Sequence, residues 1–359
     1  MRRQPDPRLP AQRPLRPTQR RGCAPRWCVW PLLRGSALPW LLPLLAVLGT
    51  QPAAAEPLDV FVSVLPLQTF VERVGAERVQ VHTMVQPGHS PATYEPTPRQ
   101  IAALADADLY LRVGVPFESA WMKRITATNP DMPVVDLRDG IGLRPQQAHD
   151  NDNDNDNDND NDNDNDNDND NDNEPSRAQG GRHKHEHEAM DAHVWTSPRL
   201  VRKMAESIRA ALTRLDPAGA GVYARNQAML DAELTALDQD LQARLADLHE
   251  RSFLVYHPAW GYFADAYGLM QVPIEYEGKS PGARRLAQII DQARTIGARV
   301  ILVQPQFDRR AAGQVARAIG GRVETVDPLA TDYAANLLRL ADIIRDAYEQ
   351  QEKTDDPPQ

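Results

Sequence analysis

Two hydrophobic patterns alternate along this chain. Short runs rich in apolar and β-branched residues, such as DVFVSV at 59–64, are typical of strands buried in a parallel sheet. Between them lie segments in which apolar residues recur at helical spacing. Strands are predicted at 59–64, 79–84, 109–113, 134–137, 253–256, 271–274, 300–304 and 323–326. This alternation of strands and helices predicts an α/β fold with parallel sheets.

The longest predicted helix lies between the two groups of strands. From about residue 221 to 249 the sequence has no proline or internal glycine, and leucines recur at helical spacing. A helix of this length is roughly 40 Å long. We interpret 216–250 as a rigid helix that joins an amino-terminal α/β lobe, 56–215, to a carboxyl-terminal lobe, 251–351. Further helices are predicted at 69–74, 99–105, 198–215, 261–267, 283–296, 309–319 and 333 to about 351, followed by a disordered tail at 352–359.

Residues 1–55 differ in pattern from the rest of the chain. They contain nine Arg and one acidic residue, then an apolar run at 38–48 and three alanines at 53–55. This order is typical of a secretory signal peptide. The apolar run contains two prolines, and it is shorter than the ~20 residues that span a bilayer, which argues against a membrane anchor. Both cysteines lie in this segment, so we expect an exported, periplasmic chain with neither a disulfide nor a thiolate metal site.

A tract of alternating Asp and Asn accounts for most of the negative charge. Without residues 1–55 the net charge is −18, and it is −6 when the twelve Asp between 150 and 172 are also left out. Because the tract has no apolar surface to bury, it cannot offset the entropy of ordering, and we predict that 150–187 is disordered. The ordinary charge of the remainder argues against nucleic acid or an anionic membrane as a partner.

Four candidate metal ligands lie in loops that follow predicted strands or the disordered tract. Ligand sites in open α/β sheets lie at the carboxyl ends of the strands, so two facing lobes would bring two ligands from each half to a shared cleft. Three imidazoles and one carboxylate form a tetrahedral set suited to Zn²⁺. The candidates are His89, His193, His257 and Asp327.

The remaining histidines are given other roles. Three of them alternate in a polar run and are predicted to gather metal weakly through multivalent binding: His183, His185 and His187. We expect His149, at the border of the tract, to join this weak binding. His82, inside a strand, and His249, near a helix end where a cation is favourable, are interpreted as structural residues.

The sequence around the candidate ligands resembles the ZnuA/TroA-type solute-binding proteins of zinc and manganese ABC importers. The matching stretches read PGHSPATYEPTP at 87–98, DAHVWTSP at 191–198, YHPAWGYFA at 256–264 and QPQF at 304–307. The resemblance runs from about residue 57 to 348, apart from the Asp-Asn tract. It implies two α/β lobes joined by a long helix, with the metal held in the cleft between them.

The resemblance carries over to the ligands one position at a time. His193, His257 and Asp327 match the family's later ligands. Many members have Pro-His just before the Thr-Tyr-Glu-Pro stretch, where this chain has Pro-Ala. We therefore expect His89, three residues earlier than Pro-His would place it, to be the replacement ligand, with Glu95 as the alternative.

The choice of metal depends on the third ligand in chain order, His257. Manganese-selective relatives tend to carry a carboxylate at the position of His257. Three imidazoles favour a borderline-soft ion such as Zn²⁺ over Mn²⁺, which prefers oxygen. A manganese-binding member of the same family is the alternative.

The resemblance implies a monomeric periplasmic protein without enzymatic activity, which binds Zn²⁺ and delivers it to an ABC permease in the inner membrane. Two other classes remain open. A secreted zinc hydrolase would need an open water position and a general base such as Glu95 or Asp265, but the sequence has no His-Glu-x-x-His motif. A metal-dependent surface adhesin would need an anchor or tether, and the sequence shows neither.

Overall fold

The computed structural model describes residues 56–146, 190–248, 250–275 and 279–355. The predicted signal peptide (1–55) and the predicted disordered insert (150–187), with its three histidines, lie outside the described residues. So do His149 and His249. The described part has two four-stranded sheets, and all strands in each sheet pair in parallel, as the alternating pattern predicts.

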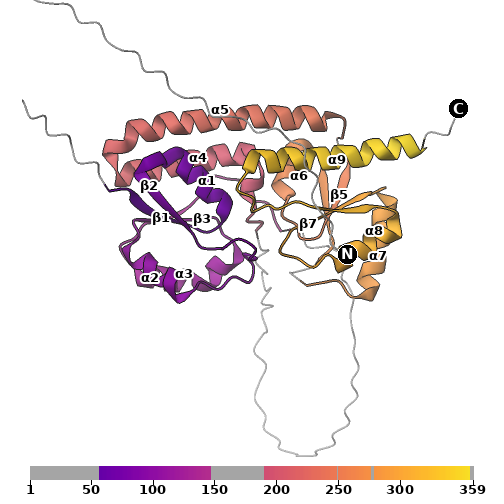
Figure 1. The fold of residues 1–359 in the computed structure, drawn as a ribbon, viewed down its shortest axis with the longest axis horizontal. Helices are drawn as coiled ribbons and strands as arrows, with labels where there is room; N and C mark the ends of the chain where they lie inside the picture. Colours follow the sequence, from indigo (N-terminus) through magenta and orange to yellow (C-terminus); the bar gives the residue numbers. More distant parts are fainter. Residues whose placement is uncertain (1–55, 147–189, 249, 276–278, 356–359) are drawn as a thin grey trace, which may run out of the picture. The chain divides into compact units, whose positions relative to one another are not determined.

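The first sheet has the order β2-β1-β3-β4 and places β1 at its centre. Val60, Phe61 and Val62 of β1 are almost completely buried, because helices cover both faces of the sheet (Figure 1). The strands are β1 (Leu58–Val62), β2 (Val79–Thr83), β3 (Leu109–Arg112) and β4 (Val134–Asp136). The helices between them are α1 (Leu65–Gly75), α2 (Pro98–Ala103) and α3 (Pro116–Thr128), with short 3₁₀ turns at Ala76–Arg78 and Leu104–Asp106.

The second sheet repeats the same strand order, as β6-β5-β7-β8. Its two central strands, β5 and β7, are buried along their whole length. The strands are β5 (Ser252–Val255), β6 (Met270–Pro273), β7 (Val300–Val303) and β8 (Arg322–Thr325). The helices are α6 (Gly261–Tyr267), α7 (Ala283–Thr295), α8 (Arg310–Ile319) and α9 (Tyr333–Asp355).

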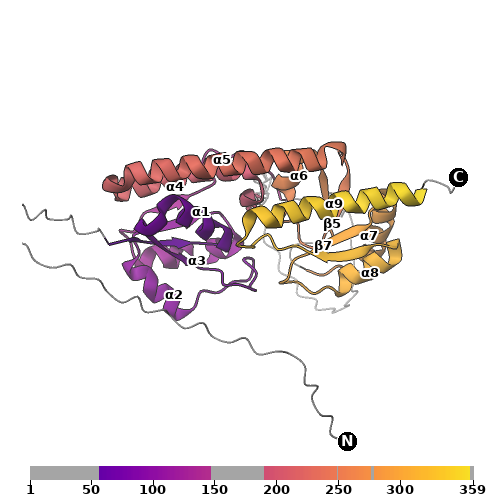
Figure 2. The same cartoon turned by 45° about the horizontal axis from the view of Figure 1, so that its top comes forward.

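A long helix joins the two α/β lobes. The helix α5 (Ala220–Leu245) follows α4 (Pro198–Leu215) after a 3₁₀ turn at Pro217–Gly219, and a second 3₁₀ turn, Ala246–Leu248, follows it (Figures 1 and 2). It packs against α1 and α4 of the first lobe and against α6 and α9 of the second. Its buried leucines serve both lobes: Leu230 and Leu234 lie in the first hydrophobic core, and Leu237, Leu241 and Leu245 lie in the second.

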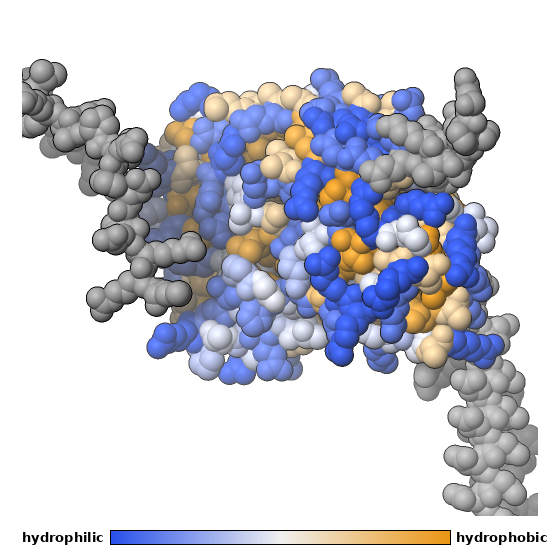
Figure 3. Space-filling model, turned by 45° about the vertical axis from the view of Figure 1, so that its right-hand side comes forward, coloured by the Kyte–Doolittle hydropathy of each residue, from blue (hydrophilic) through white to orange (hydrophobic). Residues whose placement is uncertain are grey.

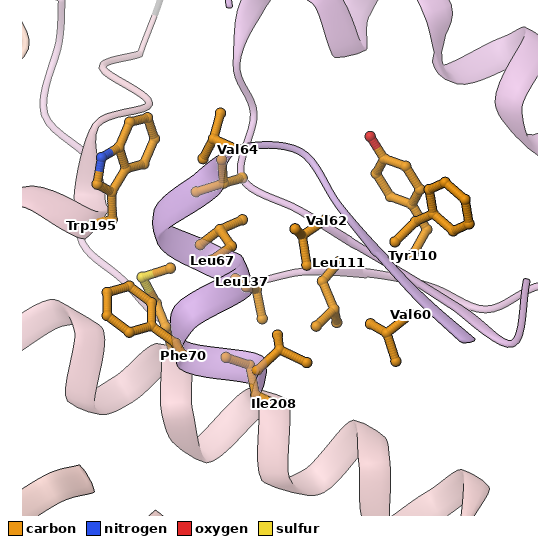
Figure 4. Close-up of a cluster of buried hydrophobic side chains, with 14 of the residues drawn as sticks. Val60, Val62, Val64, Leu67, Phe70, Tyr110, Leu111, Leu137, Trp195 and Ile208 are labelled. Atoms are coloured by element: carbon orange, nitrogen blue, oxygen red, sulfur yellow. The ribbon is translucent and has the colours of Figure 1, made fainter. Parts of the chain in front are cut away.

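The first core is built where α1 covers the sheet (Figure 4). Val60 and Val62 of β1 and Leu67 and Phe70 of α1 are at most 1% exposed. Trp195, from the segment that precedes α4, joins the same cluster. Removing one such side chain costs about 2–5 kcal/mol of unfolding free energy, so the segment around Trp195 is firmly attached to this lobe.

Two side chains from the second half of the chain pack into the first core at the lobe boundary. Tyr262 of α6 and Leu329, just after β8, belong to the second half of the chain but are buried in the first core. The indole Nε1 of Trp195 donates a hydrogen bond to the carbonyl oxygen of Pro328, 2.8 Å away. These contacts attach the loop that carries Asp327 to the lobe that carries His193.

Three helices differ from the sequence prediction, and the first is α1, which begins at Leu65, four residues before the predicted start at 69. The helix α3 was not predicted, because it buries only Phe117, Glu118 and Ile125 and its apolar face is too narrow to stand out in the sequence. The terminal helix α9 continues to Asp355, so the disordered tail predicted at 352–359 begins too early. The lobe boundaries at 215 and 250 stay a prediction.

The surface of the described residues carries few large apolar side chains. Met190, Met229 and Met270 are about half exposed, and the face in Figure 3 mixes hydrophilic with hydrophobic residues. In this part of the chain, none of the helices combines the length and the apolar character needed to cross a bilayer.

Candidate metal-binding site

His193 lies at the start of a 3₁₀ turn, Val194–Thr196, between the insert and α4. Its Nδ1 is 2.7 Å from Oδ1 of Asp191, and its backbone N–H donates to the same oxygen at 2.9 Å. Asp191 is 4% exposed, so this carboxylate is a buried support behind the imidazole. A hydrogen bond from Nδ1–H to a carboxylate leaves the lone pair on Nε2, which is the atom that then binds a metal.

His257 repeats this arrangement in the second lobe. It follows β5, and its Nδ1 is hydrogen bonded to Oε1 of Glu275, which follows the neighbouring strand β6. The Glu275 side chain is 2% exposed. Gln304, which follows β7, donates from its side chain to the carbonyl oxygen of His257 at 2.9 Å, and the Phe307 ring stacks on the imidazole with centroids 5.2 Å apart. The parallel sheet therefore brings three strand ends together around this histidine.

The two supported imidazoles meet across the lobe boundary. The ring centroids of His193 and His257 are 5.2 Å apart, at an interplanar angle of 72°. Each ring has its Nδ1 bonded to a buried carboxylate, so both Nε2 atoms are available to a shared ion. In zinc sites, a ligating histidine commonly donates its other ring N–H to a carboxylate in this way.

Asp327 lies two residues beyond β8, on the same sheet as His257. Its Oδ1 accepts hydrogen bonds from Nε2 of Gln306 at 3.1 Å and from the backbone N–H of Leu329 at 3.0 Å. The next residue, Pro328, is the one that binds Trp195. The carboxylate is thus held in a turn that contacts the His193 segment.

His89 lies on an exposed loop between β2 and α2. Its backbone N–H donates to Gln86 O at 3.1 Å, and its ring is in edge contact with Tyr94, with centroids 5.7 Å apart. The alternative ligand Glu95 is exposed on the same loop. Among residues 56–146, 190–248, 250–275 and 279–355, the structure shows no group of three or more His, Cys, Asp or Glu arranged to hold a metal.

The structure therefore brings together two of the four predicted ligands. His193 and His257 are in ring contact, whereas His89 and Asp327 are not assembled with them into a metal group. His82, interpreted as structural, lies in β2, stacks on Phe61 and pairs with Asp59 through Nε2 at 3.2 Å.

The supporting residues were not identified from the sequence. Asp191 is only two positions before His193, so the Asp-x-His spacing was a signal that could have revealed it. Glu275 gave no such signal, because it is 18 residues from His257 and meets it only through the parallel sheet. Gln304 opens the matching stretch at 304–307, but its contact with His257 spans 47 residues and also depends on the sheet. Their roles depend on the pairing of β5 with β6 and β7.

The electrostatics of Asp191 favour its charged form. Burial alone would raise the pKa of this carboxyl, but the interactions with His193 and the nearby Arg144 guanidinium hold it below its usual range. By contrast, burial raises the pKa of Asp265, which lies 3.4 Å from Arg144 across the lobe boundary. Asp191 is therefore a carboxylate that can orient His193 and increase its basicity as a metal ligand.

Replacing Glu275 with glutamine tests this support on the other histidine. The amide keeps the shape of the side chain but loses the charge, so we expect Glu275→Gln to weaken zinc binding by about 10- to 100-fold. Competition with a chelating dye measures the affinity. Glu72→Gln, an exposed carboxylate on α1, is the control and should leave it unchanged. Equal affinities of the two variants would contradict a supporting role for Glu275.

Comparisons with known proteins agree with this architecture. The family model described as "Zinc-uptake complex component A periplasmic" (ZnuA) matches residues 60–347. The high-affinity zinc uptake system protein ZnuA of Paracoccus denitrificans is 40% identical over 273 residues, which cover 72% of this chain and 80% of that protein.

Solved structures give the same result. A crystal structure of ZnuA shares 35% identity with a TM-score of 0.69, covering 81% of this chain and 99% of that one. A zinc-bound deletion mutant of ZnuA shares 34% identity with a TM-score of 0.66, covering 81% and 98%. Fold and site together define a periplasmic or extracellular solute-binding protein of a metal uptake system. The chain belongs to the ZnuA family.

Proposed function

We propose that this protein binds Zn²⁺ with high affinity after export to the periplasm and delivers it to an ABC permease in the inner membrane. The family describes the zinc-binding component of an uptake complex, and related chains are named high-affinity zinc uptake proteins. The observation that carries the proposal for this chain is the pair His193 and His257, which come from different lobes, lie in ring contact and are each supported by a buried carboxylate.

The proposed zinc site takes its other two ligands from His89 and Asp327. Asp327 lies on a turn whose next residue, Pro328, accepts a hydrogen bond from Trp195, and the Trp195 ring centroid is 5.2 Å from that of His193. The turn that carries this carboxylate is therefore attached to the segment that carries His193. His89 is on an exposed loop, which can move at little energetic cost. Three imidazoles and one carboxylate would then complete a tetrahedral set that favours Zn²⁺ over Mn²⁺.

The export route and the partner complete the proposal. The basic and apolar segment at 1–55 is proposed to be a cleaved signal peptide, and the exported chain to act as a monomer. Transfer to the permease requires the ion to be released from between the lobes. We propose no enzymatic activity, since a site with four protein ligands leaves no open position for an activated water.

The insert is proposed to have a separate, weaker role. His183, His185 and His187 precede His193 and would raise the local zinc concentration through weak multivalent binding. A related ZnuA has been solved with zinc bound after deletion of one of its segments, so zinc binding in that protein does not require the whole chain.

Zinc titration of the exported chain, followed by native mass spectrometry and calorimetry, tests both parts. We expect the full chain to bind one zinc ion tightly and further ions weakly. Deletion of residues 150–187 should remove the weak sites and keep the tight one. A full chain that binds no zinc tightly would contradict the proposed function. Loss of the tight site in the deletion variant alone would contradict only the division of roles.

A further inference from the structure

The residues that precede the insert and those that follow it pair with each other close to His193. Pro145 and Met190 form an isolated antiparallel bridge, and the backbone N–H of Asp191 donates to the carbonyl oxygen of Arg144 at 2.9 Å. We refer to these paired backbone segments, 144–145 and 190–191, as the neck. Asp191, the last residue of the neck, is also the carboxylate that supports His193.

A tyrosine from the other lobe bridges the two segments of the neck. The hydroxyl of Tyr262, on α6, accepts a hydrogen bond from the backbone N–H of Arg144 at 3.1 Å and donates one to the carbonyl oxygen of Asp191 at 2.9 Å. Tyr262 is 5% exposed and its ring lies in the first hydrophobic core. The Tyr262 hydroxyl is therefore the hydrogen-bond partner of one backbone N–H and one backbone carbonyl oxygen of the neck, and it reaches them from the other lobe.

The guanidinium of Arg144 fills the space beside this tyrosine. It lies 4.0 Å from Oδ2 of Asp191 and 3.4 Å from Oδ2 of Asp265, and over the Tyr262 ring at 5.9 Å from the centroid. A Cβ added at Gly261 would be 2.0 Å from Nη1 of Arg144, so the glycine leaves the space that the guanidinium occupies. Both carboxylate oxygens of Asp191 therefore have a partner. Oδ2 lies near the Arg144 guanidinium, and Oδ1 is hydrogen bonded to the backbone N–H and the Nδ1 of His193.

We infer that Tyr262 is a positioning residue that anchors Asp191, and through it His193, to the lobe that carries His257, and so controls how fast zinc is released. This inference rests on the proposed function. Without the hydroxyl, the neck loses both of its Tyr262 bonds, so Asp191 and the imidazole it supports are held less tightly at the lobe boundary. Partners bonded directly to a metal ligand change metal affinity by about 10- to 100-fold. Tyr262 acts one contact further out, through the backbone of Asp191, so the lower end of this range is expected.

Tyr262→Phe tests the inference in the exported full chain. The zinc-loaded protein is mixed with excess EDTA in a stopped-flow instrument, and the rate of zinc dissociation is measured. We expect the rate to rise by about tenfold, the lower end of that range. The matched control is Tyr267→Phe on the same helix, because its hydroxyl donates to Asp238 at 3.0 Å and not to the neck. Its dissociation rate should stay within about twofold of the wild-type rate, within the scatter usual for a substitution away from the site.

A spectroscopic readout separates positioning from general stability. With Co²⁺ in place of zinc, the visible absorption bands report the geometry of the ligands. They should shift in Tyr262→Phe and stay in place in Tyr267→Phe, whatever the melting temperatures. If Tyr262→Phe has wild-type release and an unshifted spectrum while the wild type binds zinc tightly, the inference is wrong and the proposed function stands. Should Tyr262→Phe fail to fold, amide hydrogen exchange of the Arg144 N–H, which donates to the Tyr262 hydroxyl, is measured in the zinc-loaded wild type. Exchange as fast as that of an exposed amide would show that Tyr262 does not hold the neck, and would overturn the inference as well.

Discussion

Replacing His257 with alanine is expected to lower zinc affinity by about 100-fold or more, and replacing His193 to do the same. Zinc binding to a four-ligand site contributes about 10–16 kcal/mol, which is about 3 kcal/mol per ligand. Each 1.4 kcal/mol is about a tenfold change in affinity. The substitution also removes the hydrogen-bond partner of a buried carboxylate. Alanine at position 193 leaves Asp191, and alanine at position 257 leaves Glu275, buried beside an empty space.

Equilibrium competition with a chelator of known affinity measures this loss. The control is His82→Ala, because His82 lies in the edge strand β2 and pairs with Asp59 away from the proposed site. It should keep wild-type affinity. Since Glu275 is 2% exposed and loses its partner in His257→Ala, the melting temperature is recorded without zinc in parallel. Wild-type zinc affinity in folded His193→Ala and His257→Ala would remove the basis of the proposed site.

Replacing Glu118 with alanine is expected to destabilise the fold by about 3 kcal/mol. This carboxylate is fully buried in α3 and accepts the backbone N–H groups of Val113 and Gly114, each at 2.9 Å. It also accepts from Nε of Arg112 at 2.9 Å. Alanine leaves two backbone donors at the end of β3 without their acceptor, and each such buried group costs about 1–3 kcal/mol.

Urea unfolding of the zinc-free protein measures the change in unfolding free energy. The control is Glu206→Ala on α4, where the side chain is exposed and the expected change is within about 0.5 kcal/mol. A loss in Glu118→Ala as small as in the control would show that water or a shifted backbone replaces the carboxylate. The affinity for zinc should change little, because Glu118 does not contact His193 or His257.

The periodicity of the sequence was enough to predict most elements of this fold. The helices α4 and α6 have the predicted bounds, and the predicted strands agree with the observed ones to within one or two residues. These elements depend on local patterns: runs of buried residues, helical spacing and prolines at helix starts. The helix α3 was missed because one of its few buried positions is the carboxylate of Glu118, which resembles a surface residue in the sequence.

The sequence also selected two histidines that the structure brings into contact. His193 and His257 were chosen because they follow a tract or a strand and match family motifs, and the structure brings their rings into contact. Metal ligation by any of the four residues remains a prediction, and the described residues do not assemble His89 and Asp327 with the other two.

What the sequence determined by itself is therefore the α/β pattern, the long joining helix and the histidines that follow strand ends, because each depends on residues close together along the chain. Only the tertiary structure decided which carboxylate supports each histidine and that Tyr262 bridges the neck. Glu275 and Tyr262 reach their partners over 18 and 71 residues or more, and such contacts depend on strand pairing and on the packing of one lobe against the other. Those arrangements leave no periodic pattern in the sequence, so they become visible only when the chain is folded.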